Sequence, residues 1–243
     1  MKNLFLLIPL VTLAGAFSYP TTLSAQETYV IPPPLSAEQF PADIDMTSLG
    51  RLPQVQRADL DAVGRDAFDT YVSPSTGYET GLRGPIGMWM NSPVLAKAIF
   101  PLRERVRYGS AKDQRLTELT IISTAREVSN QYEYTAHEGA ARTAGLEEAI
   151  IEFVKYRRSF DEAPNIPEFG DAERTIIQFT REVVSEEKVS SETFAKALDI
   201  FGREGLTDLV GLIGYYNLVA ITLKAFDVHQ PPGRELLLPI ATP

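Results

Sequence analysis

The chain has 243 residues, of which 32 are acidic, 23 are basic and none is cysteine, and its formal net charge is −9. This acidic balance excludes a protein that binds nucleic acid through a basic face. The absence of cysteine excludes disulfides, thiolate catalysis and the zinc and iron–sulfur sites that cysteine builds. Two histidines, His137 and His229, leave little for a histidine-rich metal centre.

Residues 1–25 have the pattern of an export signal. Lys2 supplies a positive charge, residues 4–17 form an apolar run, and small residues lead to a cleavage site after Ala25. The alternative is an uncleaved N-terminal anchor. No later segment has the length and apolarity expected of a membrane span. We therefore expect an exported protein, periplasmic or secreted, without a stable membrane span once the signal is removed.

Residues 26–58 are rich in proline. Because proline fixes φ and removes a backbone donor, this part predicts an extended arm. A helical domain is expected over residues 59–227, beginning with an amphipathic helix over 59–71. The last residues, 228–243, form a C-terminal tail.

Residues 73–92 carry glycine and proline throughout and predict a long loop. Loops of this length inside a domain are often functional or wrap a partner. The large side chains of this loop are Met88, Trp89 and Met90. They either cover a pocket or a neighbouring subunit, or pack onto the core.

From Ser92 onward the apolar residues recur with a helical period. Ser92 and Pro93 form a typical helix start, and Gly145 and Gly202 stand where left-handed C-caps belong. Further helices are expected over residues 113–129, 131–144, 146–159, 171–185, 191–202 and 206–226. No stretch alternates as strands joined by tight turns do, so the predicted fold class is all-α.

A weak internal repeat accompanies this pattern. Residues 95–100 resemble residues 194–199, and residues 116–119 resemble residues 206–209 in the same order. A duplicated helical unit explains both matches. Chance recurrence of short helical patterns rich in Ala, Leu and Lys is the alternative.

The stretch from Leu116 to Gly145 holds the candidate chemistry. Glu133 and His137 are four residues apart, which places their Cβ atoms about 5–6 Å apart on one helix face. A carboxylate there orients the imidazole, fixes its tautomer and favours its protonated form, which is the minimum needed to move a proton near neutral pH. Tyr132 and Tyr134 are candidates for the walls of the site. A solvated helix face with the same spacing is the alternative.

Charged residues on neighbouring helices are open to two interpretations. Glu118 and Arg126 either form a buried structural ion pair or belong to a substrate-binding site. A basic run also precedes this stretch, and we expect it to be a solvated helix face; it contains Arg103, Arg105, Arg107 and Arg115.

This stretch resembles the carboxymuconolactone decarboxylase family and its alkylhydroperoxidase D-like relatives. The resemblance is carried by Glu118-Leu119, Ala125-Arg126, Tyr132-Glu133-Tyr134, His137, Ala140 and Ala144-Gly145-Leu146. Looser similarity extends from Gly84-Pro85 to Asp227 and includes Gly214-Tyr215-Tyr216. The resemblance implies an alkylhydroperoxidase D-like orthogonal bundle of helices. It also implies a homo-oligomer, a trimer or hexamer, for which the arm and the tail look suited to wrap neighbours.

Peroxidase members of the family resemble a Glu-x11-Cys-x2-Cys-x3-His pattern, in which paired thiols reduce peroxides. This chain keeps the frame, with Asn130 and Glu133 where the two cysteines would stand. Thiol peroxidase chemistry is therefore not expected. What remains resembles the decarboxylase branch, which implies catalysis by protein acid and base groups, with no metal and no organic cofactor, on a small substrate carrying a carboxylate or lactone.

On this resemblance His137 is the main proton donor or acceptor, and Glu133 orients it or carries a second proton. Arg126 holds the substrate carboxylate, and Glu118 positions Arg126 or takes part in the proton relay. Asn130, Tyr132, Tyr134 and Trp89 complete the expected substrate-binding set. The alternatives are an isomerase and a non-catalytic oligomeric binding protein on the same fold.

Overall fold

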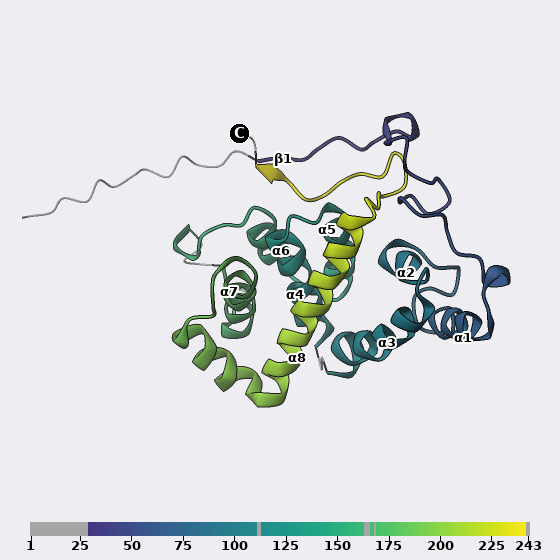
Figure 1. Cartoon of the computed structure of the whole chain (residues 1–243). Helices are drawn as coiled ribbons and strands as arrows, with labels where there is room; N and C mark the ends of the chain where they lie inside the picture. Colours follow the sequence, from purple (N-terminus) through teal and green to yellow (C-terminus); the bar gives the residue numbers. More distant parts are fainter. Residues whose placement is uncertain (1–28, 111–112, 163–165, 168, 242–243) are drawn as a thin grey trace, which may run out of the picture.

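The computed structural model describes residues 29–110, 113–162, 166–167 and 169–241 (Figure 1). The expected signal segment lies outside the described residues. The α-helices are α1 (Ala62–Tyr71), α2 (Gly84–Trp89), α3 (Pro93–Glu104), α4 (Gln114–Glu127), α5 (Gln131–Thr143), α6 (Glu148–Lys155), α7 (Asp171–Ser185) and α8 (Ser191–Ala225). Short turns of other helical types are η1 (Ala37–Gln39), η2 (Arg57–Asp59), η3 (Arg105–Gly109) and η4 (Phe160–Glu162), and the strands are β1 (Tyr29–Val30) and β2 (Ile240–Ala241). The all-α prediction is confirmed.

Helix α4 lies at the centre of the molecule and packs against α5, α7 and α8. Every residue from Thr117 to Arg126 is buried, including the polar ones. The threonine hydroxyls bond within the helix; for example, Thr124 Oγ1 donates to the carbonyl of Thr120 at 2.8 Å. Hydroxyl groups satisfied in this way are buried at little cost. The sequence predicted one apolar face for this helix, but it is enclosed on all sides.

Two apolar clusters flank this central helix. Leu119 and Ile122 of α4 face a cluster formed with α6, α7 and the first half of α8. Ile121 faces a second cluster formed with α1, α2, α3 and the second half of α8. In Figure 1, α8 accordingly runs between α1–α3 on one side and α6 and α7 on the other.

The expected loop over residues 73–92 contains a short helix, α2, and all six of its residues are buried. Trp89 donates its indole N–H to Thr222 Oγ1 at 2.8 Å and packs edge-on against Tyr215. Met88 and Met90 are buried in the same cluster. These three side chains therefore belong to the core of this chain, and neither a pocket nor a subunit neighbour is needed to cover them.

The arm and the tail pair with each other. Strands β1 and β2 are antiparallel, with Tyr29 opposite Ala241. Nearer the helices, the Phe40 ring of the arm stacks on the His229 ring of the tail. The tail also binds α5, because Gln131 exchanges two side-chain hydrogen bonds with the backbone of Leu238. Both segments thus pack on their own chain.

Helix α8 bends at Gly202, whose φ of 66° and ψ of −179° are not helical. The two predicted helices, 191–202 and 206–226, are its two arms. Within the part of the chain that the structure describes, α8 is long and apolar enough to cross a membrane, judged by length and composition. The expectation that no later segment reaches that length and apolarity was therefore wrong. More than half of the most apolar stretch of α8 is buried inside the protein, and α8 contributes to both apolar clusters, so it packs here as a core helix.

Candidate active site

Helices α4 and α5 bring three ionisable side chains together. The chain turns sharply between them at Ser129, where φ is 52°, and Asn130 then caps α5 by accepting a hydrogen bond from the Glu133 N–H at 3.0 Å. This cap starts α5 so that Glu133 and His137 lie one turn apart on the side that faces α4. Glu118 of α4 stands opposite them.

His137 lies between two carboxylates. Its Nδ1 is 2.7 Å from Oε2 of Glu118, and its Nε2 is 3.3 Å from Oε2 of Glu133. The hydroxyl of Tyr216 on α8 lies 3.4 Å from the same Nε2, and the two rings meet edge-on. The sequence predicted that Glu133 would contact His137. The structure adds Glu118 as the nearer partner.

The two carboxylates set the charge of this group. Burial by itself would lower the pKa of His137, but the hydrogen bonds and charges of Glu118 and Glu133 outweigh it and raise that pKa above its ordinary value. Burial likewise disfavours ionised Glu118, yet His137 and Arg107 hold the pKa of this carboxyl below its ordinary value. Both shifts favour the charged forms, an imidazolium paired with a carboxylate.

Arg107 is the second partner of Glu118, with Nη2 3.1 Å from Oε1. Its position depends on η3, a single π-helical turn that continues α3. Such turns are rare and are often found at functional sites. The sequence suggested that Glu118 would act with Arg126, and this pairing is wrong. Eight residues of α-helix rise about 12 Å, too far for one ion pair.

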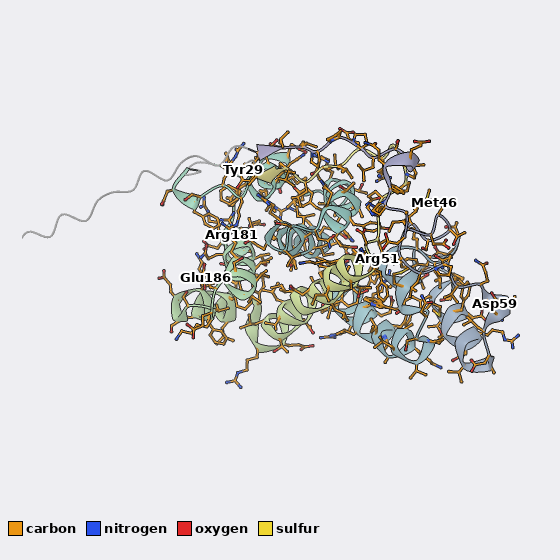
Figure 2. The ribbon with its side chains drawn as sticks, turned by 45° about the horizontal axis from the view of Figure 1, so that its top comes forward. Tyr29, Met46, Arg51, Asp59, Arg181 and Glu186 are labelled. Carbon is orange, nitrogen blue, oxygen red and sulfur yellow. The ribbon has the colours of Figure 1, made fainter. Side chains whose placement is uncertain are left out.

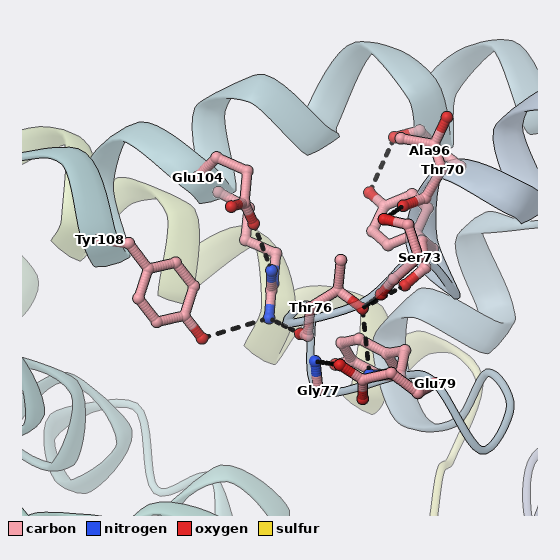
Figure 3. A network of polar contacts seen from close by, with 11 residues as sticks. Thr70, Ser73, Thr76, Gly77, Glu79, Ala96, Glu104 and Tyr108 are labelled. Atoms are coloured by element: carbon pink, nitrogen blue, oxygen red, sulfur yellow. Dashed lines mark hydrogen bonds and ion pairs between the residues drawn. The ribbon is translucent and has the colours of Figure 1, made fainter.

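The basic run is also different from the expected solvated face. Arg103 is only 2% exposed and donates to the carbonyl of Thr76 at 2.6 Å. Figure 3 shows Thr76, Glu104 and Tyr108 around this guanidinium, which bonds to all three. Arg105 is exposed, as expected. Arg103 and Arg107 instead face inward, because α3 and η3 turn them towards α4 and α8.

His137, Glu133, Arg103 and Arg107 border one cavity of about 310 Å³. Its lining is mostly aromatic and basic, and comprises Thr76, Gly77, Tyr78, Arg83, Pro85, Arg103, Arg107, Tyr108, Tyr132, Glu133, Ala136, His137, Tyr215, Tyr216 and Val219. Burial raises the pKa values of Tyr78 and Tyr216 above the ordinary value, so both phenols stay protonated and able to donate at neutral pH. The cavity therefore presents cations, hydroxyl donors and a charged imidazole to a small molecule.

The other predicted site residues divide between this cavity and the rest of the fold. Tyr132 lines the cavity, as expected. Asn130 caps α5 and does not line it, and Tyr134 is fully buried in the cluster around α6 and α7. Trp89 is a core residue. Arg126 lies at the far end of α4 and borders a different cavity.

The residues of this site that sequence reasoning missed include Arg103, Arg107, Tyr78 and Tyr216. Arg103 and Arg107 are four residues apart, a spacing that favours one shared helix face but does not tell whether that face is buried. Tyr216 belonged to a matched segment, but no role was assigned to it. Tyr78 gave no signal, because it comes from an irregular segment whose path the sequence does not reveal.

Within the described residues, no group of three or more His, Asp or Glu side chains is arranged to hold a metal ion. The lining of the His137 cavity includes three guanidinium groups, those of Arg83, Arg103 and Arg107. Arg107 keeps donors beyond its bond to Glu118, since a guanidinium carries five N–H groups.

No family model matches the chain, and no curated protein matches it. Among solved structures, the chain is similar to a crystal structure of a protein of unknown function from Agrobacterium tumefaciens, suggested there to be an antioxidant defence protein, AhpD. The TM-score is 0.51 and the sequence identity 19%, over 61% of this chain and 98% of that chain. The fold is alkylhydroperoxidase D-like. Identity this low supports the fold alone, so the resemblance to carboxymuconolactone decarboxylases stays a prediction.

Proposed function

We propose that this alkylhydroperoxidase D-like protein is a cofactor-independent acid/base enzyme, a decarboxylase-like lyase, that acts on a small substrate carrying a carboxylate or a lactone. The observation that supports it is the position of His137. Its ring is held between Glu118 and Glu133 at the edge of a cavity that also contains Arg103 and Arg107. A buried, charged imidazole with an oriented partner is suited to proton transfer.

Arg107 is the proposed anchor for the substrate carboxylate, in the role first assigned to Arg126. The guanidinium of Arg103 is engaged by Thr76, Glu104 and Tyr108, whereas the guanidinium of Arg107 donates to Glu118 alone among the described residues. Arg103 then adds positive charge without a direct contact. Because the whole protein is acidic, recognition of an anion depends on these local cations.

In the proposed reaction the substrate loses CO2 and the electron pair of the broken C–C bond passes into a neighbouring carbonyl, giving an enolate. His137 donates its Nε2 proton to the carbon and becomes neutral, while Glu118 keeps the Nδ1 proton in place. Tyr216, a protonated phenol, is placed to donate a hydrogen bond to the enolate oxygen. Water returns a proton to His137. An isomerase would use the same groups without losing CO2.

A thiol peroxidase is not part of the proposal. The chain has no cysteine. At the two positions that match the cysteines of the peroxidase pattern, Asn130 caps α5 and Glu133 contacts His137. Only the fold of the Agrobacterium protein is therefore carried over to this chain, and the antioxidant role suggested for that protein is not.

Export and self-association complete the proposal. Residues 1–25 support export to the periplasm or the outside.

A homo-oligomer, a trimer or hexamer, is supported by an exposed apolar stripe on α8 that includes Val210, Leu218 and Ile221. These residues are three, eight and eleven positions apart and so share one helix face.

The test is CO2 release from γ-carboxymuconolactone and a panel of β-keto and lactone acids. We expect turnover by the wild type and a loss of about 10²- to 10⁴-fold in His137→Asn, because His137 supplies the acid. His229→Asn is the matched control, since His229 stacks on Phe40 outside this cavity, and it should keep full activity. Equal activity in both variants would remove His137 from the mechanism. If no compound turns over but one binds, the non-catalytic binding protein becomes the better description.

A further inference from the structure

Arg126 is a buried cation for which the described residues supply no ionic partner. It is 7% exposed, its Nε has no hydrogen-bond partner, and no carboxylate of the described residues lies within ion-pair distance of its guanidinium. The described contact of its charged group is with the ring of Tyr29, whose centroid lies 5.1 Å from Cζ. Keeping an unmatched charge away from water is costly unless a partner of opposite charge is supplied.

Arg126 borders a cavity of about 310 Å³ at the end of α4 where β1 and β2 meet. One wall is mainly apolar and comes from the tail, and the other is polar. The lining comprises Tyr29, Arg126, Glu127, Ser129, Arg157, Ser185, Leu238, Pro239, Ile240 and Ala241. Figure 2 shows Tyr29 and Arg181 on this side of the molecule. The space is large enough for a small organic molecule.

The neighbouring carboxylate does not neutralise Arg126. Glu127 is 3.0 Å from Arg157 and 3.7 Å from Arg181, and it accepts a hydrogen bond from Ser185. Its single negative charge is therefore already shared by two guanidinium groups. Arg126 takes no part in this pairing, and among the described residues no carboxylate lies within ion-pair distance of it, so its guanidinium is available to a ligand in the cavity.

We infer that this cavity is a second ligand site, which binds a small monocarboxylate with its charged head on Arg126 and its apolar body against Pro239 and Ile240. A carboxylate matches the planar fork of a guanidinium, which offers two parallel N–H donors. Glu127 lines the same cavity and disfavours a doubly charged anion such as phosphate. The site is separate from the His137 cavity, and it does not depend on the proposed reaction.

Calorimetric titration of the purified protein with benzoate tests this inference at constant ionic strength. Benzyl alcohol is the neutral probe of similar shape, and inorganic phosphate is the competing anion. We expect benzoate to bind, benzyl alcohol not to bind, and phosphate to bind more weakly than benzoate. Arg126→Gln should weaken benzoate by about tenfold or more, and Arg126→Lys should also weaken it because lysine lacks the fork.

Two further variants test whether a loss of benzoate binding comes from this cavity, and not from misfolding or from the His137 cavity. Ile240→Glu places a carboxylate beside Arg126 at a position that is 47% exposed, and it should weaken benzoate without disturbing the core. Arg107→Gln alters the His137 cavity and should leave this binding unchanged. The inference is overturned if benzoate does not bind the wild type, if it binds Ile240→Glu and a folded Arg126→Gln as tightly as the wild type, or if phosphate binds more tightly than benzoate.

Discussion

His137 contacts a carboxylate at each ring nitrogen, and this arrangement ties its charge to the stability of the fold. Its pKa is raised in the folded protein, so the stabilisation it provides is complete below its unfolded pKa of about 6.5 and is lost as pH rises through the folded value. The pKa of Glu118 is lowered, so its stabilisation is present above about 4.5 and is lost as pH falls through the folded value. The pair is strongest between these two limits.

The raised pKa of His137 predicts how the stability of the fold changes with pH. The free energy of unfolding of the wild type should fall between about pH 6 and about pH 9, because His137 loses its proton while Glu118 stays charged. In His137→Asn the fall should be smaller, and in His229→Asn it should keep its full size. Denaturant unfolding at the two pH values measures it. An equal fall in His137→Asn and the wild type would contradict the proposed charge pair.

Part of the site was accessible from the sequence. The contact between Glu133 and His137 follows from their spacing on one helix, and Glu118 entered through the family resemblance. Arg107 was placed wrongly on a solvated face because its direction depends on how α3 continues through the π turn of η3. Arg126 was assigned to the substrate because it matches the family's signature. Its distance along α4 from Glu118 was enough to argue against that role.

At the scale of elements, α8 depends on one glycine for its shape. Gly202 has a φ of 66° with extended ψ, a conformation that is almost confined to glycine, and a Cβ there would meet no atom within 4 Å. Glycine is therefore required at the bend of α8 by its backbone conformation, and not by a lack of room for a side chain. It lets the first arm close the cluster around α7 while the second carries Tyr216 to His137.

We expect Gly202→Ala to lower the free energy of unfolding by about 1–3 kcal/mol, which is the cost of forcing a side chain into this conformation. Gly139→Ala is the matched control. Gly139 also has open space around it, but it lies inside α5 with helical backbone, so alanine there should be neutral or stabilising by up to about 1 kcal/mol. Chemical denaturation of the two variants tests this. Equal effects would show that the bend is not strained.

The elements themselves were largely predictable. Most helices after Ser92 follow from their apolar period, and Gly202 was recognised as a helix end. Helix α2 was missed because it is buried on all sides and contains glycine and proline, so no amphipathic period marks it. The predicted helix over 146–159 is shorter, since Arg157 adopts a positive φ just after α6. Periodicity reveals a half-buried helix, but it does not reveal one that is enclosed.

At the scale of the whole molecule, the exposed stripe on α8 gives the proposed oligomer a defined surface. Ile221 is 65% exposed, and a glutamate there would have to be buried against a second copy. We expect Ile221→Glu to shift the protein towards monomers by about tenfold or more in dissociation constant, because unpaired charge is costly inside an interface. Val63→Glu on α1 adds the same charge to another exposed apolar position and should change nothing.

Light scattering on a size-exclusion column measures the mass of each variant. A wild type that is monomeric at all concentrations would rule out the proposed assembly. An oligomer that survives Ile221→Glu would place its interface elsewhere.

The pairing of β1 with β2 has a consequence for how the protein folds. Tyr29 pairs with Ala241, so β1 lacks this partner strand until residue 241 has been made. Contacts between residues so far apart in sequence require the closure of a very long loop, which is a slow and late event. The helices have local contacts and would form first. The cavity at Arg126, whose walls include both Tyr29 and Ile240, would then be completed in the last step of folding, after the His137 cavity is in place.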